Sequence, residues 1–200
     1  MGALENKAKK GLIWSSIDKF STLVIQFSVG IVLARLLAPE DFGLIGMITI
    51  LISISQCLVD SGFYTALVQK KNITNTDYST ILFFNIGVAF FLYLILYVAA
   101  EYIAVFYQEP LLIDLVKVVS LNIIILSTTV VHKAMLARRI DFRVQAIAHI
   151  LSSVISGAIG IYAAFNGHGV WALVYHSLSR GVLVSILYWS LNRWTPSFIF

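Results

Sequence analysis

Long apolar stretches follow one another along almost the whole chain, separated by short polar breaks. A helix rises 1.5 Å per residue, so about 20 apolar residues cross a hydrocarbon core of about 30 Å. Strands of a membrane β-barrel would instead alternate polar and apolar residues in segments of about ten. The pattern therefore predicts an all-α, polytopic membrane protein, a single unit over residues 1–200. Its transmembrane helices are expected at residues 11–37, 42–68, 79–107, 111–137, 144–165 and 170–192.

The breaks hold residues that end helices or stay in water. The first is Ala38-Pro39-Glu40-Asp41 and the last is Asn166-Gly167-His168-Gly169. Proline cannot continue a helix, and an Asn-Gly pair favours a turn. We therefore expect tight helical hairpins, with Asp41 at the start of the second helix.

Composition supports the membrane assignment. The chain is 59% hydrophobic and 12% charged, and its mean hydropathy is +0.89. Soluble domains usually hold about 45–50% apolar and about 25% charged residues. No soluble domain fits between the predicted helices.

Basic residues predict the orientation, because cytoplasmic loops of membrane proteins are enriched in lysine and arginine. Alternate connections hold nearly all of these residues: Lys7, Lys9 and Lys10, then Lys70 and Lys71, then Arg138, Arg139 and Arg143, and finally Arg193. Both termini are therefore expected in the cytoplasm. This bias also accounts for the net charge of +4, so no contiguous basic face for nucleic acid is expected.

Four of the six predicted helices carry polar residues three or four positions apart, which places them on one face of each helix. These stripes are Ser15, Lys19, Thr22 and Gln26; Thr49, Ser53, Gln56 and Asp60; Gln145, His149, Ser152, Ser156 and Gly160; and His176 with Arg180. Small residues at this spacing let helices approach closely, so we favour packing for Ser152, Ser156 and Gly160. A charge costs more than a hydroxyl in hydrocarbon, so we favour a hydrated cavity for the stripes with Lys19, Asp60 and Arg180.

Arg180 is the strongest functional candidate. It lies roughly ten residues from either end of its span, too deep for its side chain to reach the interface easily. Lys19 lies about two turns inside the first helix, beside Asp18.

The histidines carry a weaker signal. His149 and His176 are expected to be hydrogen-bonded packing residues. His132 and Lys133, at the inner end of the fourth helix, are expected to meet lipid headgroups.

Signatures of enzymes are missing. The four histidines lack the spacing of a zinc site, and the chain holds neither a glycine-rich phosphate loop nor a nucleophile turn. We therefore expect no catalytic residue, no metal and no cofactor.

Short phrases from one end of the chain to the other carry a family resemblance: Lys10-Gly11-Leu12-Ile13-Trp14-Ser15, Leu33-Ala34-Arg35-Leu36-Leu37-Ala38-Pro39-Glu40-Asp41-Phe42-Gly43, Asp60-Ser61-Gly62-Phe63-Tyr64-Thr65-Ala66-Leu67-Val68-Gln69, Ala104-Val105-Phe106-Tyr107-Gln108-Glu109-Pro110, Arg138-Arg139-Ile140-Asp141-Phe142 and Gly167-His168-Gly169-Val170-Trp171-Ala172-Leu173. Together they resemble the amino-terminal part of bacterial polysaccharide flippases of the Wzx type. The resemblance implies the fold of the multidrug, oligosaccharidyl-lipid and polysaccharide exporter superfamily, in which two six-helix lobes enclose a central cavity.

The implied cargo is an oligosaccharide linked to polyprenyl pyrophosphate, which is moved across the bacterial inner membrane for polysaccharide or lipopolysaccharide biosynthesis. The phrases lie mostly in turns, so the resemblance assigns no residue to the cargo. Residue chemistry does suggest roles. Arg180 can bind phosphate oxygens in a bidentate fork and Lys19 can act as a point charge, whereas sugar hydroxyls suit the side chains of Thr22, Gln26, Ser53 and Gln56.

Other functions stay open. A cation-coupled multidrug exporter of the same superfamily would use Asp60 or Asp18 as its coupling carboxylate. A truncated chain without transport of its own and a membrane enzyme of glycan assembly are further alternatives. Because the resemblance covers one lobe of two, the expected partners are membrane lipids, the lipid-linked cargo, and a second lobe. That lobe is a missing carboxy-terminal half, a separate chain or a second copy.

Overall fold

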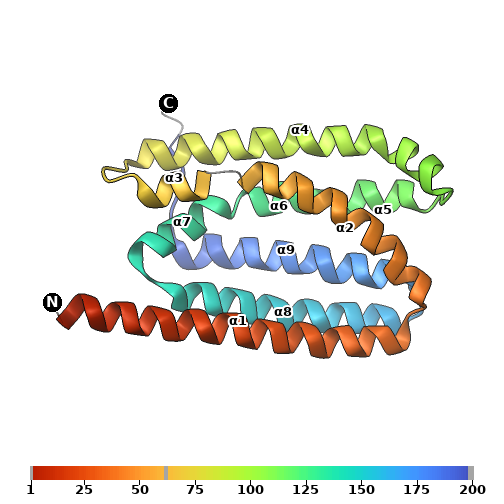
Figure 1. Ribbon diagram of the computed structural model, residues 1–200, viewed down its shortest axis with the longest axis horizontal. Helices are drawn as coiled ribbons and strands as arrows, with labels where there is room; N and C mark the ends of the chain where they lie inside the picture. Colours follow the sequence, from red (N-terminus) through yellow and green to blue (C-terminus); the bar gives the residue numbers. More distant parts are fainter. Residues whose placement is uncertain (1, 61–62, 198–200) are drawn as a thin grey trace.

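The computed structural model of the protein describes residues 2–60 and 63–197, with side chains from residue 9 onward except that of Asp60. Helices make up nearly all of this part of the chain (Figure 1). They are α1 (Gly2–Leu36), α2 (Pro39–Asp60), α3 (Phe63–Gln69), α4 (Asn75–Tyr107), α5 (Leu112–Val119), α6 (Leu121–Ser127), α7 (Val130–Arg139), α8 (Phe142–Phe165) and α9 (Val170–Asn192).

The predicted all-α membrane fold is confirmed. The described helices form six spans that are long and apolar enough to cross a membrane: Lys9–Leu36, Pro39–Gln69, Asn75–Tyr107, Leu112–Arg139, Phe142–Phe165 and Val170–Asn192. Their bounds lie close to the apolar stretches of the sequence. Long side chains that would be buried in a soluble protein are widely exposed here, among them Phe20, Phe27 and Phe106, as a lipid-facing surface requires.

The fourth span is interrupted where the sequence predicts one continuous helix. The Ser120 hydroxyl donates to the Val116 carbonyl at 2.6 Å, and the hydroxyls of Thr128 and Thr129 donate at 2.7 Å to carbonyls three residues earlier. Such bonds compete with backbone amides for the same carbonyls and bend helices. The span is thereby divided into α5, α6 and α7, although its hydropathy is continuous.

The helices follow an order in space that differs from their order in the chain (Figure 1). α8 packs between α1 and α9, and α9 also contacts α6. On the other side, α4 packs along α5 and α6, while α3 packs on α7. α2 crosses in front of the lobe and contacts α5, α6 and α9. α1 begins and α9 ends on the same side of the lobe, where Figure 1 marks the N- and C-termini.

α1 and α8 approach each other closely at Gly157. A Cβ added to Gly157 would lie 2.5 Å from the Val29 Cγ2 of α1, so only glycine allows this separation. Lipid tails are as apolar as leucine, and close packing rather than the hydrophobic effect must hold such helices together.

The stripe of small residues on α8 packs as predicted. Ser152 and Ser156 are fully buried, and a Cβ at Gly160 would lie 2.8 Å from the His176 Cβ of α9. α8 is thus held tightly against helices on both sides.

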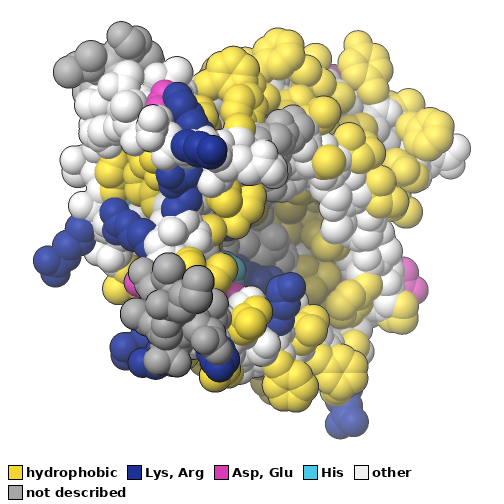
Figure 2. Space-filling view, turned by 60° about the vertical axis from the view of Figure 1, so that its left-hand side comes forward, with side chains coloured by type: hydrophobic (Ala, Val, Ile, Leu, Met, Phe, Trp, Pro, Cys, Tyr) yellow, Lys and Arg dark blue, Asp and Glu magenta, His cyan; other side chains and the backbone are white. Residues whose placement is uncertain are grey.

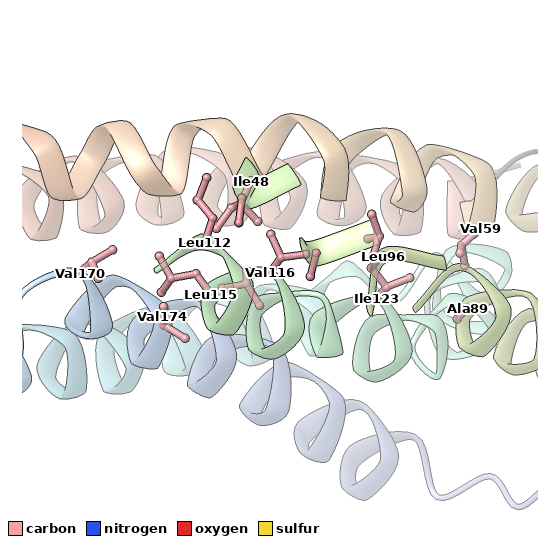
Figure 3. Close-up of a cluster of buried hydrophobic side chains, with 13 residues drawn as sticks. Ile48, Val59, Ala89, Leu96, Leu112, Leu115, Val116, Ile123, Val170 and Val174 are labelled. Atoms are coloured by element: carbon pink, nitrogen blue, oxygen red, sulfur yellow. The ribbon is translucent and has the colours of Figure 1, made fainter. Parts of the chain in front are cut away.

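The largest cluster of buried apolar side chains joins α2, α4, α5, α6 and α9 (Figure 3). Ile48 of α2, Leu112 and Leu115 of α5, and Val170 and Val174 of α9 belong to this cluster. Val119 and Val174 of the same cluster also line a cavity between the helices.

Candidate substrate cavity

A cavity of about 440 Å³ lies among α2, α5, α6, α7, α8 and α9. This volume is in the range of small-molecule sites. The polar residues in its lining are Thr49, Asn122, Lys133, His149, His176, Ser177 and Arg180. No aspartate or glutamate belongs to this lining within the part of the chain that the structure describes. Figure 2 brings the terminal side of the lobe forward and shows a hollow in this face, with lysine and arginine side chains on one side of it.

Arg180 lines the cavity from the middle of α9 and is half-buried. The side-chain amide of Gln26, on α1, faces its guanidinium. With the amide oxygen turned toward Arg180, that oxygen accepts hydrogen bonds from both terminal nitrogens. Gln26 therefore holds the guanidinium fork in place without neutralising its charge.

Asn122 and Ser177 line the cavity where α6 meets α9. The Asn122 amide nitrogen donates to the Ser177 hydroxyl at 3.0 Å. Gly181 makes room for Asn122, because a Cβ at this position would overlap the Asn122 amide oxygen. The glycine thus lets a polar side chain sit between two tightly packed helices.

A chain of hydrogen bonds joins α1, α8 and α9 beside the cavity. The His149 Nδ1 lies 3.0 and 3.1 Å from the two carboxylate oxygens of Asp18, and its Nε2 lies 2.9 Å from the Tyr188 hydroxyl. The Thr22 hydroxyl adds a longer bond of 3.4 Å to Asp18. Tyr188 is fully buried, whereas His149 also borders the cavity. Asp18 is connected to the cavity wall through His149, which lines the cavity together with Arg180.

Only some of the substrate-binding residues predicted from the sequence lie at the cavity. Arg180 lines the cavity, and Gln26 joins it through the guanidinium. Thr22 instead bonds Asp18. Lys19 is exposed. It lies on the same face of α1 as Gln26, two turns before it.

On α2, Thr49 lines the cavity and Ser53, one turn farther, is exposed. Gln56 is half-buried and does not belong to the lining. The side chain of Asp60 lies outside the described residues.

The histidines differ from expectation in an informative way. His149 is hydrogen-bonded, as predicted, but its partner is a carboxylate 131 residues away in the chain. Tyr188 was not singled out by any pattern, because a tyrosine in an apolar span carries no distinctive signal. His176 borders the cavity.

His132 was expected at the headgroups, and this expectation is wrong. The side chain is fully buried, with its ring 4.7 Å from that of Trp189 and 5.6 Å from that of Trp194. The chain after α9 turns back over α4, where the Trp194 indole bonds Asn75, and this segment covers His132. Lys133, next to it, borders the cavity.

One of the basic residues used to predict orientation has a structural role. Arg138 donates from Nη1 to the carbonyls of Leu67, Val68 and Lys70 at 2.8, 2.9 and 2.6 Å. These are carbonyls at the end of α3, which have no partner within a helix. Arg138 therefore fastens α3 to α7.

Known proteins similar to this chain act in polysaccharide biosynthesis. The succinoglycan biosynthesis transport protein ExoT of Rhizobium meliloti is 28% identical over 188 residues, which are 94% of this chain and 38% of that protein. The teichuronic acid biosynthesis protein TuaB of Bacillus subtilis is 30% identical over 202 residues, which are 100% of this chain and 42% of that protein. The lipopolysaccharide biosynthesis protein WzxC of Escherichia coli is 23% identical over 140 residues, 70% of this chain and 28% of that protein.

The chain spans about two fifths of the length of ExoT and TuaB. No solved structure matches it significantly. The model of a family described as "Polysaccharide biosynthesis protein" matches residues 32–200. Because this match covers most of the chain and agrees with the resemblance to Wzx-type flippases, the chain belongs to this family of polysaccharide biosynthesis proteins.

Proposed function

We propose that this chain forms one lobe of a flippase that moves an oligosaccharide linked to polyprenyl pyrophosphate across the bacterial inner membrane. One observation carries the proposal: Arg180 lies deep in a membrane helix bundle and presents its guanidinium to a cavity whose described lining has no carboxylate. Burying a cation in this way is costly unless an anion binds there. The family supports a role in polysaccharide assembly.

The chemistry of the cavity suits a pyrophosphate. A guanidinium binds phosphate oxygens in a bidentate fork, and its attraction is stronger in a cavity of low dielectric constant than in water. Lys133 contributes a second positive charge to the lining. The exposed Lys19 gives a third on the face of α1 that leads to Gln26 and Arg180.

Neutral polar groups in the same wall suit sugar hydroxyls. Thr49, Asn122 and Ser177 offer hydroxyl and amide groups to the cavity. A cationic drug would instead favour carboxylates in the lining; the described lining has none, and the Asp18 carboxylate beside it is bonded to His149. The anionic cargo is therefore the better fit.

A second lobe is part of this proposal. The polar face of α2 runs from Thr49 in the cavity wall to the exposed Ser53, and that of α1 runs from Gln26 to the exposed Lys19. Polar groups that face hydrocarbon cost free energy. We therefore place a second six-helix unit, from the same or another polypeptide, against these two faces.

The orientation with both termini in the cytoplasm follows from the lysine and arginine bias. The start of α1 and the end of α9 lie on the same side of the lobe, which suits this assignment. The hollow of Figure 2 then faces the cytoplasm, where lipid-linked sugars would be loaded.

Variants of Arg180 at the chromosomal locus of the native host test the proposal. Arg180→Ala should lower surface polysaccharide about tenfold or more, because loss of charge-assisted bonds costs about 1.5–3 kcal/mol and 1.4 kcal/mol is a factor of ten. Arg180→Lys should restore part of the export, since the charge survives without the fork. Arg35→Ala is the matched control, because Arg35 is exposed and is not part of the cavity. Normal export by Arg180→Ala, at a normal protein level, would refute the assignment.

A further inference from the structure

The bond chain of Asp18, His149 and Tyr188 calls for an explanation beyond cargo binding. It connects α1, α8 and α9 through groups that can gain or lose a proton. Its imidazole borders the cavity, and 27% of the His149 side chain and 15% of the Asp18 side chain are exposed. Water in the cavity can therefore reach the histidine.

The bonding pattern fixes where the hydrogens lie. An ionised carboxylate only accepts hydrogen bonds, so the His149 Nδ1 carries a hydrogen and donates it to Asp18. In the neutral ring, Nε2 has a lone pair and accepts from the Tyr188 hydroxyl. Proton uptake forms one new N–H bond at Nε2. The Tyr188 hydroxyl, whose hydrogen can rotate, then changes from donor to acceptor, and the chain stays intact in both states.

The surroundings of His149 contain more positive than negative charge. α8 packs against α1, α7 and α9. The titratable and charged groups that these helices present to the ring or to the shared cavity wall are Asp18 on α1, Lys133 on α7, and His176, Arg180 and Tyr188 on α9. Asp18 is the single carboxylate in this set. It bonds His149, which shares the cavity wall with Arg180.

We propose that His149 is a proton-binding site whose protonation strengthens anion binding at Arg180. While the ring is neutral, the charge of Asp18 partly offsets that of Arg180. When the ring takes a proton from cavity water, the imidazolium and Asp18 form a neutral pair, and the charge of Arg180 is unopposed. Proton and anion thus bind cooperatively. By linkage, an anion at Arg180 must favour protonation of His149 by the same factor.

This inference rests on the proposed anion site at Arg180 and adds to it the partner of the cargo, a proton. It also predicts opposite effects on anion binding for two neighbouring substitutions. His149→Gln keeps the offset by Asp18 at every pH, so anion binding stays weak. Asp18→Asn removes the offset at every pH, so binding stays strong. A merely structural network would predict loss of binding in both variants.

The experiment measures the affinity of inorganic sulfate for the purified protein in lipid nanodiscs by titration calorimetry. Sulfate is suitable because it remains a dianion throughout the range used, from about pH 8.5 to about pH 5.5, in which imidazole groups ordinarily titrate. The wild type should bind sulfate about tenfold more tightly at the lower pH, within the usual range of coupling between sites. At both pH values, the His149→Gln variant should bind sulfate weakly and the Asp18→Asn variant should bind it tightly.

A control separates this site from a histidine outside the cavity. His168→Gln, in the exposed turn before α9 and not part of the cavity lining, should keep the pH dependence of the wild type. Proton uptake by the wild type on sulfate binding, read from the heat in buffers of different ionisation enthalpy, needs no variant and so does not depend on the folding of one.

The outcomes distinguish the two proposals. If Arg180→Gln binds sulfate as well as the wild type, or if sulfate does not bind, the anion site fails and the coupling fails with it. If binding depends on Arg180 but is independent of pH, or if His149→Gln behaves as the wild type, the coupling alone is overturned.

Discussion

Gly157 sets the distance between α1 and α8, and Gly157→Ala should destabilise the lobe. The added Cβ would lie 2.5 Å from the Val29 Cγ2, whereas ordinary contact begins at 3.4 Å. Valine is stiff at χ1 in a helix, so its methyl group cannot turn away easily. The two helices must therefore separate by roughly 1 Å at this point, and overpacking of this kind typically costs about 1–3 kcal/mol.

Thermal unfolding in detergent measures the effect. For a chain of this size, about 1 kcal/mol corresponds to about 2–4 °C in Tm, so a cost of about 1–3 kcal/mol should lower the Tm of Gly157→Ala by about 2–12 °C. Gly87→Ala is the matched control in α4, because nothing lies within 4 Å of its added Cβ. There the change should raise Tm slightly, since alanine is the better helix former by about 0.5–1 kcal/mol.

A double variant tests the stated cause. Val29→Ala removes the methyl groups that the new Cβ would meet, so Gly157→Ala should cost less in that background than in the wild type. An unchanged Tm in Gly157→Ala would contradict the close approach, and equal costs in both backgrounds would contradict the contact with Val29.

Two further predictions concern the lobe in its membrane. With Cys57 replaced, a single cysteine at Asn72 should resist an impermeant thiol reagent in intact cells and one at Gly167 should react, because basic loops stay in the cytoplasm; the opposite labelling would reverse the orientation. In the same background, Ser53→Cys should cross-link in native membranes to a second six-helix unit, because the polar face of α2 leads there from the cavity. The product is a band of higher mass if that unit is a separate chain, or a band of altered mobility if it belongs to the same polypeptide; the absence of both would leave that face to lipid and contradict the second lobe.

Hydropathy was enough to predict the spans, because crossing a membrane demands long apolar stretches whatever their packing. It also pointed to Arg180, whose depth in its span is a property of the sequence. It could not reveal the interruptions at Ser120 and Thr128, since these arise from hydroxyls that bond nearby carbonyls in one particular rotamer. The burial of His132 was missed for a related reason, because the covering Trp194 follows α9.

The bond chain beside the cavity was out of reach of pattern analysis. Asp18 and His149 meet because α1 packs along α8 in one particular register, to which the close approach at Gly157 contributes. Polar spacing within one helix contains no information on the rotation of its neighbour. Asp18 was a candidate as a coupling carboxylate, but its partners came from the packing.

Stability alone does not account for this bond chain. Asp18 lies about two turns inside the first span, where a carboxylate costs free energy, whereas hydrogen bonds between membrane helices contribute about 0.6 kcal/mol each on average. Small apolar residues packed as at Gly157 would join the helices without a charged group in the span. What apolar packing cannot supply is a charge that changes with proton uptake. A carboxylate and an imidazole beside Arg180 supply it, and this difference is what the sulfate titration measures.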